Sequence, residues 1–75
     1  MQRGFNRMTP QDIKRLRDTL GLSAADLAAL LETDENTVRR MEMRRDTKNA
    51  RLPARRMTRL MQAYRDGWRP HDWPE

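Results

Sequence analysis

A short polar segment near the middle of the chain carries side chains suited to paired hydrogen bonds with flat, polar ligand edges. Asn36, Arg39 and Arg40 lie within five residues of one another, and Glu35 and Thr37 flank Asn36. An Arg guanidinium donates two hydrogen bonds to guanine O6 and N7, an Asn amide pairs with adenine, and a carboxylate accepts from cytosine N4. These residue types therefore suggest the reading of base edges. The alternative is an exposed, solvated helix surface.

Residues 35 to about 43 or 44 are expected to form the helix that positions these side chains. Asp34 is suited to the N-cap because its carboxylate can accept from the free N–H groups of the first turn. With Val38 at the centre of the buried face, a rotation of 100° per residue turns Asn36 and Arg40 to the opposite side. The predicted polar face is therefore the outer face.

Three further helices are expected around this one. Thr9 and Pro10 begin the first helix, which Gly21 ends, and Ser23 caps the second. The second helix and the helix of the polar segment then form a helix-turn-helix. A fourth helix begins at Pro53. The buried faces are expected to contain the apolar residues that repeat at helical spacing, namely Ile13, Leu16, Leu20, Leu27, Leu30, Leu31, Met41, Met57, Leu60, Met61 and Tyr64.

Positive charge is concentrated directly after the polar segment. Residues 44–59 contain seven basic residues and one acidic residue, a sum of +6, whereas the rest of the chain sums to −1. Such a block can be a phosphate-binding surface, a membrane-surface patch or a solvated face. Fourteen of the 16 basic residues are Arg, whose planar fork suits phosphate. We assign phosphate binding to Arg44, Arg45, Lys48, Arg51 and Arg55, and to the free N–H groups of the helix that starts at Ser23 and Ala24.

The segment from Thr9 to Tyr64 resembles the Cro/CI-type (XRE-like) helix-turn-helix repressors of phages and bacteria. The resemblance is carried by Leu22-Ser23, Leu27-Ala28, Leu30-Leu31, Thr37-Val38 and Arg40-Met41-Glu42. It implies a helix that enters the major groove of double-stranded DNA, and a homodimer that occupies a palindromic operator. The small size and the GWRP-type tail also resemble compact phage regulators such as anti-CRISPR-associated autorepressors, which implies control of the chain's own operon.

Three features depart from the family pattern. Ala24 stands where the family often has a Gln that bonds a phosphate or a base edge, and Glu32 stands where Gly is usual in the turn. If Glu32 must adopt left-handed backbone angles, the cost is about 1 kcal/mol. The loop from Arg44 to Leu52 is longer than the family's usual connection. These departures shift part of the expected DNA anchoring to the Arg44–Arg55 segment.

One small all-α domain is the expected architecture, because 75 residues leave no room for a second domain. We expect a mobile basic arm over residues 1–8, a DNA-binding domain of about four helices over residues 9–66, and a short aromatic tail over residues 67–75. The sequence has neither a run of about 20 apolar residues nor a signal-peptide core, so a cytoplasmic protein without membrane contact is expected.

The aromatic residues of the C-terminal region have two interpretations. Tyr64, Trp68 and Trp73 could fold back over the core, or they could form a two-fold dimer interface, since aromatic residues dominate such contacts. We expect the dimer, because repressors of this class place two recognition helices one DNA turn apart. Repression would then follow from the exclusion of polymerase from an occupied promoter.

Two other function classes stay open. The chain could be an antitoxin or adaptor that binds a partner protein through its fourth helix and tail, or a non-specific nucleic-acid or membrane-surface binder that uses only the basic block. Catalysis is not expected, because the only Ser is explained as a helix cap and the only His, His71, lies in the tail. With no Cys and scattered carboxylates, neither a metal site nor a cofactor is expected.

Overall fold

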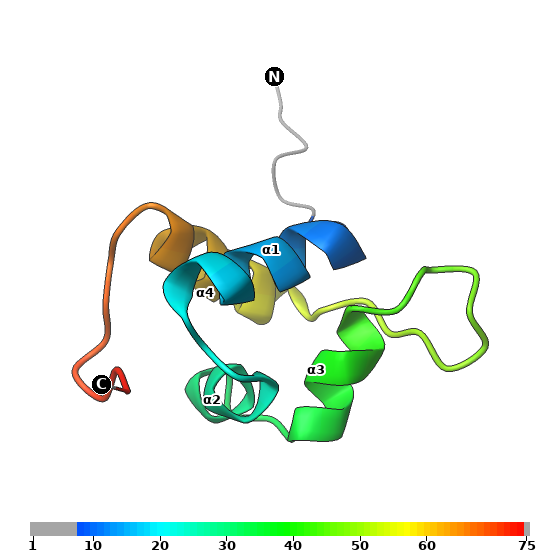
Figure 1. Ribbon diagram of the computed structural model, residues 1–75, viewed down its shortest axis with the longest axis horizontal. Coiled ribbons are helices and arrows are strands. Elements are labelled where there is room, and N and C mark those ends of the chain that lie inside the picture. Colours follow the sequence, from blue (N-terminus) through cyan, green and yellow to red (C-terminus); the bar gives the residue numbers. More distant parts are fainter. Residues whose placement is uncertain (1–7, 75) are drawn as a thin grey trace.

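The computed structural model describes residues 8–74, which contain four helices and no strand (Figure 1). They are α1 (Pro10–Leu20), α2 (Ala24–Leu30), α3 (Glu35–Met41) and α4 (Arg55–Arg65). In Figure 1, α1 and α4 form one layer above α2 and α3, and the α3–α4 connection projects to the side. The predicted all-α class is confirmed.

Side-chain caps begin the first three helices at the predicted residues. The Thr9 hydroxyl accepts from the Asp12 N–H and the Asp12 carboxylate accepts from the Thr9 N–H, both at 3.0 Å. Ser23 and Asp26 form the same reciprocal pair at the start of α2, at 3.0 and 3.1 Å. Asp34 caps α3 through its carboxylate. Each cap occupies N–H groups that the helix itself leaves unpaired.

Left-handed residues end three of the helices. Gly21 (φ 70°) follows α1 and Gly67 (φ 105°) follows α4. Glu32 (φ 59°) takes the same conformation after α2 and is the single non-glycine residue with positive φ between residues 8 and 74. The turn closes as the Thr33 N–H donates to the Ala28 carbonyl at 2.9 Å. Glu32 therefore carries the backbone strain expected from the sequence.

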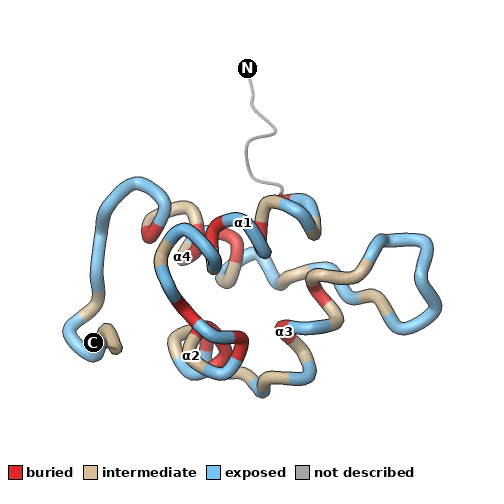
Figure 2. Tube along the Cα trace, in the orientation of Figure 1, coloured by how far each residue is buried: buried red, intermediate tan, exposed pale blue. Residues whose placement is uncertain are grey.

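A single core joins the four helices, and Figure 2 shows buried positions on each of them. Its least exposed side chains include Ile13 of α1, Leu27 of α2, Val38 of α3 and Met61 of α4. Met8, the last residue of the predicted arm, is also buried in this core. Met8 therefore packs with the helices, and residues 1–7 of the predicted arm lie outside the described residues.

Two helix boundaries differ from the sequence-based expectation. Helix α3 ends at Met41, two or three residues early, and the Arg40 carbonyl accepts from the Arg51 N–H at 3.1 Å. This long-range bond draws the returning chain onto the end of α3. Helix α4 begins at Arg55, because Ala54 is the extended N-cap (φ −63°, ψ 153°) and Pro53 stays outside the helix.

Candidate nucleic-acid interface

The outer face of α3 is polar while its inner face is fully buried. Val38 and Met41 have no exposed surface and anchor the helix to the core. Asn36 and Arg39 are exposed and Arg40 is half-buried. The buried Val38 and exposed Asn36 follow the predicted 100° rotation, because the apolar positions fix which side packs inward. Arg40, predicted on the outer side, is instead less exposed than Arg39.

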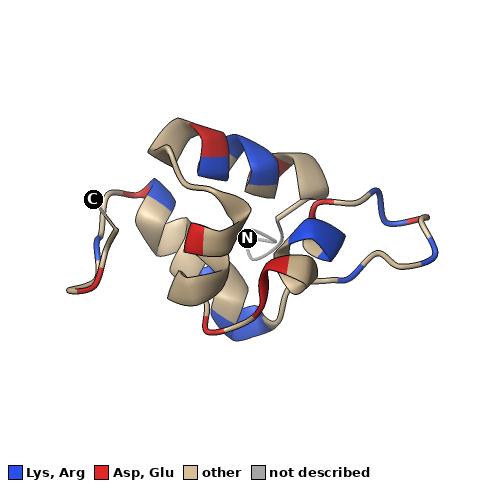
Figure 3. Ribbon diagram, turned by 60° about the horizontal axis from the view of Figure 1, so that its bottom comes forward, with Lys and Arg blue, Asp and Glu red and all other residues tan. Residues whose placement is uncertain are grey.

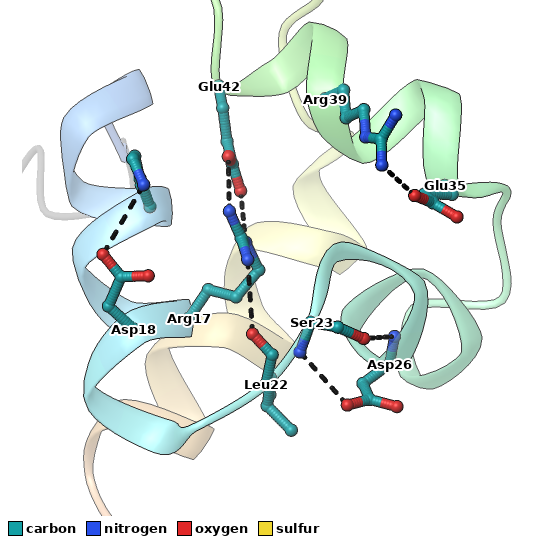
Figure 4. Close-up of polar contacts among 9 residues, drawn as sticks. Arg17, Asp18, Leu22, Ser23, Asp26, Glu35, Arg39 and Glu42 are labelled. Carbon is teal, nitrogen blue, oxygen red and sulfur yellow. Dashed lines mark hydrogen bonds and ion pairs between the residues drawn. The ribbon is translucent and has the colours of Figure 1, made fainter.

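Glu35 and Arg39 do not act as separate side chains in this structure. Arg39 Nη2 contacts Glu35 Oε2, one helical turn earlier, and Figure 4 shows the two side chains on the same side of α3. The i, i+4 spacing permits this pair, which joins two residues predicted separately as base readers.

Thr37 differs from the other predicted base-reading residues. It is half-buried and lines a groove of about 240 Å³ between α3 and the beginning of α4, opposite Ala54 and Met57. Arg51 lies on the wall of the same groove. The structure thus brings Thr37 and Arg51 together at the flank of α3 that faces α4.

The beginning of α2 offers backbone groups rather than side chains. The Ser23 hydroxyl is already engaged by the Asp26 N–H (Figure 4). Ala24 is only 9% exposed, so its side chain belongs to the core. The Ser23 N–H is likewise engaged by the Asp26 carboxylate at 3.1 Å, so a phosphate contact by these two residues would have to use the main-chain N–H of Ala24.

The basic residues assigned to phosphate binding lie between α3 and α4 and at the start of α4. Figure 3 shows Lys and Arg positions spaced along the projecting loop. Lys48, Arg51 and Arg55 are exposed. Arg44 is exposed as well, and its Nη2 is paired with Asp46 Oδ2 at 2.8 Å. This set is therefore accessible to an anion along one continuous stretch of chain.

Arg45 has a structural role that the sequence did not reveal. Its Nη1 donates to the Met41 carbonyl at 3.0 Å and to the Arg51 carbonyl at 3.4 Å, and its Nη2 donates to the Met8 carbonyl at 3.0 Å. The guanidinium thus ties the end of α3, the end of the loop and the segment before α1 together. Because these donors are occupied, Arg45 is a weaker candidate for phosphate contact than its neighbours.

Arg56 and Arg59 extend the basic surface beyond the predicted set. Both are exposed on α4, on the helix that also presents Arg55. The signal was present in the sequence, because at 100° per residue Arg59 falls opposite the apolar stripe through Met57 and Met61 and Arg56 falls at its flank. The basic surface consequently continues along the first turns of α4.

An ion pair between α1 and the end of α3 fixes the frame of the helix-turn-helix. Arg17 Nε lies 2.8 Å from Glu42 Oε2 and Arg17 Nη2 lies 3.0 Å from Glu42 Oε1, while Nη1 donates to the Leu22 carbonyl at 3.3 Å (Figure 4). The side chains are only 17% and 11% exposed. The hydrogen bond to Glu42 raises the pKa of Arg17 above its ordinary value. The sequence spacing does not indicate this pairing, because 25 positions separate the two residues.

The aromatic residues of the tail fold back on α4. Trp68 stacks on Tyr64 with ring centroids 5.9 Å apart, and Trp73 meets Tyr64 edge-on at 5.2 Å. Arg69 lies over the Trp73 ring at 4.4 Å and donates to the Tyr64 carbonyl at 2.8 Å. Tyr64 is buried, and its burial raises its pKa. Of the three predicted dimer residues, Trp68 keeps the largest exposed surface, at 51%.

Neither a metal-binding cluster nor a membrane-spanning helix is present in the described part of the chain. Residues 8–74 contain no group of three or more His, Cys, Asp or Glu side chains that could hold a metal ion. None of the four helices is long and apolar enough to cross a membrane.

Comparison with known proteins adds no relative. No protein-family model matches the chain, and neither a curated protein nor a solved structure is significantly similar to it. The candidate interface is therefore argued from the geometry of α2, α3, the projecting loop and α4.

Proposed function

We propose that the chain binds double-stranded DNA sequence-specifically through α2 and α3 and represses transcription from a phage or mobile-element promoter. The observation that carries this proposal is the division of α3 into a fully buried apolar face and an open polar face. An α-helix with a polar outer face, supported by a second short helix, fits into the major groove and can contact base edges there.

Base reading is assigned to the open face of α3. Asn36, exposed in the first turn, pairs with adenine, and Arg40, one turn later, donates to guanine. The N-terminal residues of a recognition helix are the ones that reach base edges. Helix α3 contributes little helix beyond Arg40, so its readable surface is short and the half-site should be short too.

Phosphate contacts are assigned to the basic residues that flank α3. Lys48, Arg51 and Arg55 are exposed, and Arg51 lies at the edge of the groove beside α3. Each neutralised phosphate should lower the logarithm of affinity by about 0.9 per tenfold rise in salt. A fluorescence-anisotropy titration over a salt series measures this slope, and a flat response on every duplex would contradict the assignment.

Dimerisation on a palindromic operator completes the proposal. Two copies related by a two-fold axis would place their α3 helices one DNA turn apart, about 34–36 Å. Trp68 is a large exposed aromatic side chain held rigidly on Tyr64, which suits a self-complementary contact. Occupation of a promoter by this dimer excludes polymerase.

Selection from a randomised duplex library tests the whole proposal. The expected result is a short, inverted-repeat consensus with a half-site spacing near one helical turn. Binding without any preference would favour a non-specific nucleic-acid binder that uses only the basic surface. The absence of duplex binding at low salt would favour the adaptor or antitoxin alternative, for which the exposed Trp68 beside α4 supplies a contact surface.

A further inference from the structure

The contact between Glu35 and Arg39 joins two predicted base readers into one polar unit. Arg39 keeps 63% of its side chain exposed and Glu35 keeps 43%, so both remain accessible while paired. Figure 4 shows the carboxylate nearer the beginning of α3 and the guanidinium one turn further along. An acceptor and a group of donors thus lie next to each other on the same surface.

The order of the two charges favours persistence of this pair. A carboxylate one turn before a cation is the favourable arrangement on a helix, since it also matches the helix dipole. Near DNA, an unpaired carboxylate would be repelled by the phosphates, whereas the pair is close to neutral. Approach to a duplex therefore favours keeping Glu35 and Arg39 together.

The pair retains hydrogen-bonding capacity for a ligand. A carboxylate has two oxygens with about four acceptor positions, and a guanidinium has five N–H donors. The contact joins Arg39 Nη2 to Glu35 Oε2, which leaves the Glu35 Oε1 atom and the Arg39 Nη1 hydrogens available. The unit offers an acceptor followed by donors.

The major-groove edge of a C·G base pair has the complementary order. It presents the cytosine N4 amino donor beside the guanine O6 and N7 acceptors. We propose that Glu35 and Arg39 read one C·G base pair jointly, with Glu35 accepting from cytosine N4 and Arg39 donating to guanine O6 and N7. This inference rests on the proposed function, because it requires α3 to lie in the major groove.

The experiment compares the consensus sequences selected by four proteins: the wild type, Glu35→Ala, Arg39→Ala and the double variant. The wild-type half-site is expected to contain one fixed C·G position. Each single variant should lose preference at that same position and bind the consensus about 10-fold more weakly. The double variant should lose no more affinity for the consensus than the single variant that binds more weakly, because the effects of residues that act together are not additive.

Lys14 and Asp18 supply a matched control. They form an exposed i, i+4 ion pair at 3.6 Å on α1, outside the proposed interface. Lys14→Ala and Asp18→Ala change the charge as the test variants do, and they should leave the selected consensus unchanged. As a second readout, 7-deazaguanine at the C·G position removes the N7 acceptor and should weaken the wild type but not Arg39→Ala.

The possible outcomes separate this inference from the proposed function. A selected consensus in which Glu35 and Arg39 govern different positions, or in which their losses multiply in the double variant, overturns joint reading and leaves the proposed function intact. A wild type that selects no consensus overturns both. A shared position that is not C·G also overturns the inference.

Discussion

Arg17 and Glu42 meet in a two-bond ion pair although 25 positions separate them in the chain. The pair links α1 to the residue that directly follows α3, and Arg17 also holds the Leu22 carbonyl just before α2. One guanidinium thus connects three points around the helix-turn-helix. Its geometry sets how α1 supports the two helices of the proposed interface.

Breaking this pair should destabilise the fold. Arg17→Met leaves the poorly exposed Glu42 carboxylate without its partner and should cost about 1.5–3 kcal/mol of unfolding free energy. The double variant Arg17→Met, Glu42→Leu should lose less, since two apolar groups leave no charge unpaired. Urea denaturation measures both. Loss of the exposed Lys14–Asp18 pair should change stability by less than about 0.5 kcal/mol, and an equal loss there would argue against a special role for Arg17.

Relief of strain in the turn should stabilise the fold. Glu32→Gly removes the cost of a side chain at φ 59° and should raise the unfolding free energy by about 1 kcal/mol. Glu32→Ala removes the carboxylate but keeps the left-handed side chain, so it should give no such gain. Thermal denaturation of the two variants distinguishes the backbone effect from a charge effect, which would appear equally in both.

Two arginines should affect DNA binding in different ways. Arg40→Ala should cost about 1–3 kcal/mol on the preferred site and weaken sequence preference there. Arg51→Ala should weaken all duplexes similarly and reduce the salt slope by about 1. Arg65→Ala, an exposed charge outside the predicted interface, is the control for net charge. Anisotropy titrations on consensus and scrambled duplexes measure both effects. Identical losses of affinity for the Arg40 and Arg51 variants on the two duplexes would contradict the division between base reading by Arg40 and phosphate contact by Arg51.

Acid should weaken the fold through the helix caps. Hydrogen bonding to Thr37 lowers the pKa of Asp34, and the Thr9 backbone hydrogen bond lowers the pKa of Asp12. A carboxylate whose pKa is lower in the folded state stabilises the fold at pH values above its unfolded-state pKa, about 3.9. This contribution to stability disappears as the pH falls through the folded-state pKa. Denaturation midpoints should thus be constant near neutral pH and fall below about pH 4. Asp34→Asn should flatten part of that decline, and an unchanged pH profile would exclude Asp34 as a contributor.

Self-association should depend on Trp68. Sedimentation velocity should show a dimer for the wild type and a monomer for Trp68→Ala, because Trp68 exposes the largest aromatic surface of the tail. Leu52→Ala removes another exposed apolar side chain, 73% accessible, in the α3–α4 connection outside the tail, and serves as the control. A Trp68→Ala variant that still sediments as a dimer would place the interface elsewhere.

The local signals in the sequence were sufficient for most of the fold. Hydroxyl and carboxylate caps, glycines at helix ends and apolar spacing are short-range features, and they predicted the four helices. The left-handed conformation of Glu32 was indicated only by the family resemblance, in which Gly is usual at that position. The early end of α3 was not predictable in this way, since the Arg51 N–H that reaches the Arg40 carbonyl comes from across a loop.

The candidate site was predicted less completely, and for a related reason. Side-chain exposure on α3 follows in part from helical rotation, so the open position of Asn36 was accessible from the sequence, whereas Arg40, predicted on the same side, is half-buried. The partners of long charged side chains are not, because an Arg can reach many places. Arg45 was therefore assigned to phosphate, whereas the structure gives its donors to three carbonyl groups.

The packing of the tail has an optical consequence. Both tryptophans of the chain, Trp68 and Trp73, lie against Tyr64, and Arg69 covers the Trp73 ring. Intrinsic tryptophan fluorescence therefore reports on the environment of the tail and does not report directly on α3, which contains no Trp. A change in this fluorescence on addition of a duplex would show that DNA binding at α3 alters the tail, and the measurement needs no label on the protein or the DNA.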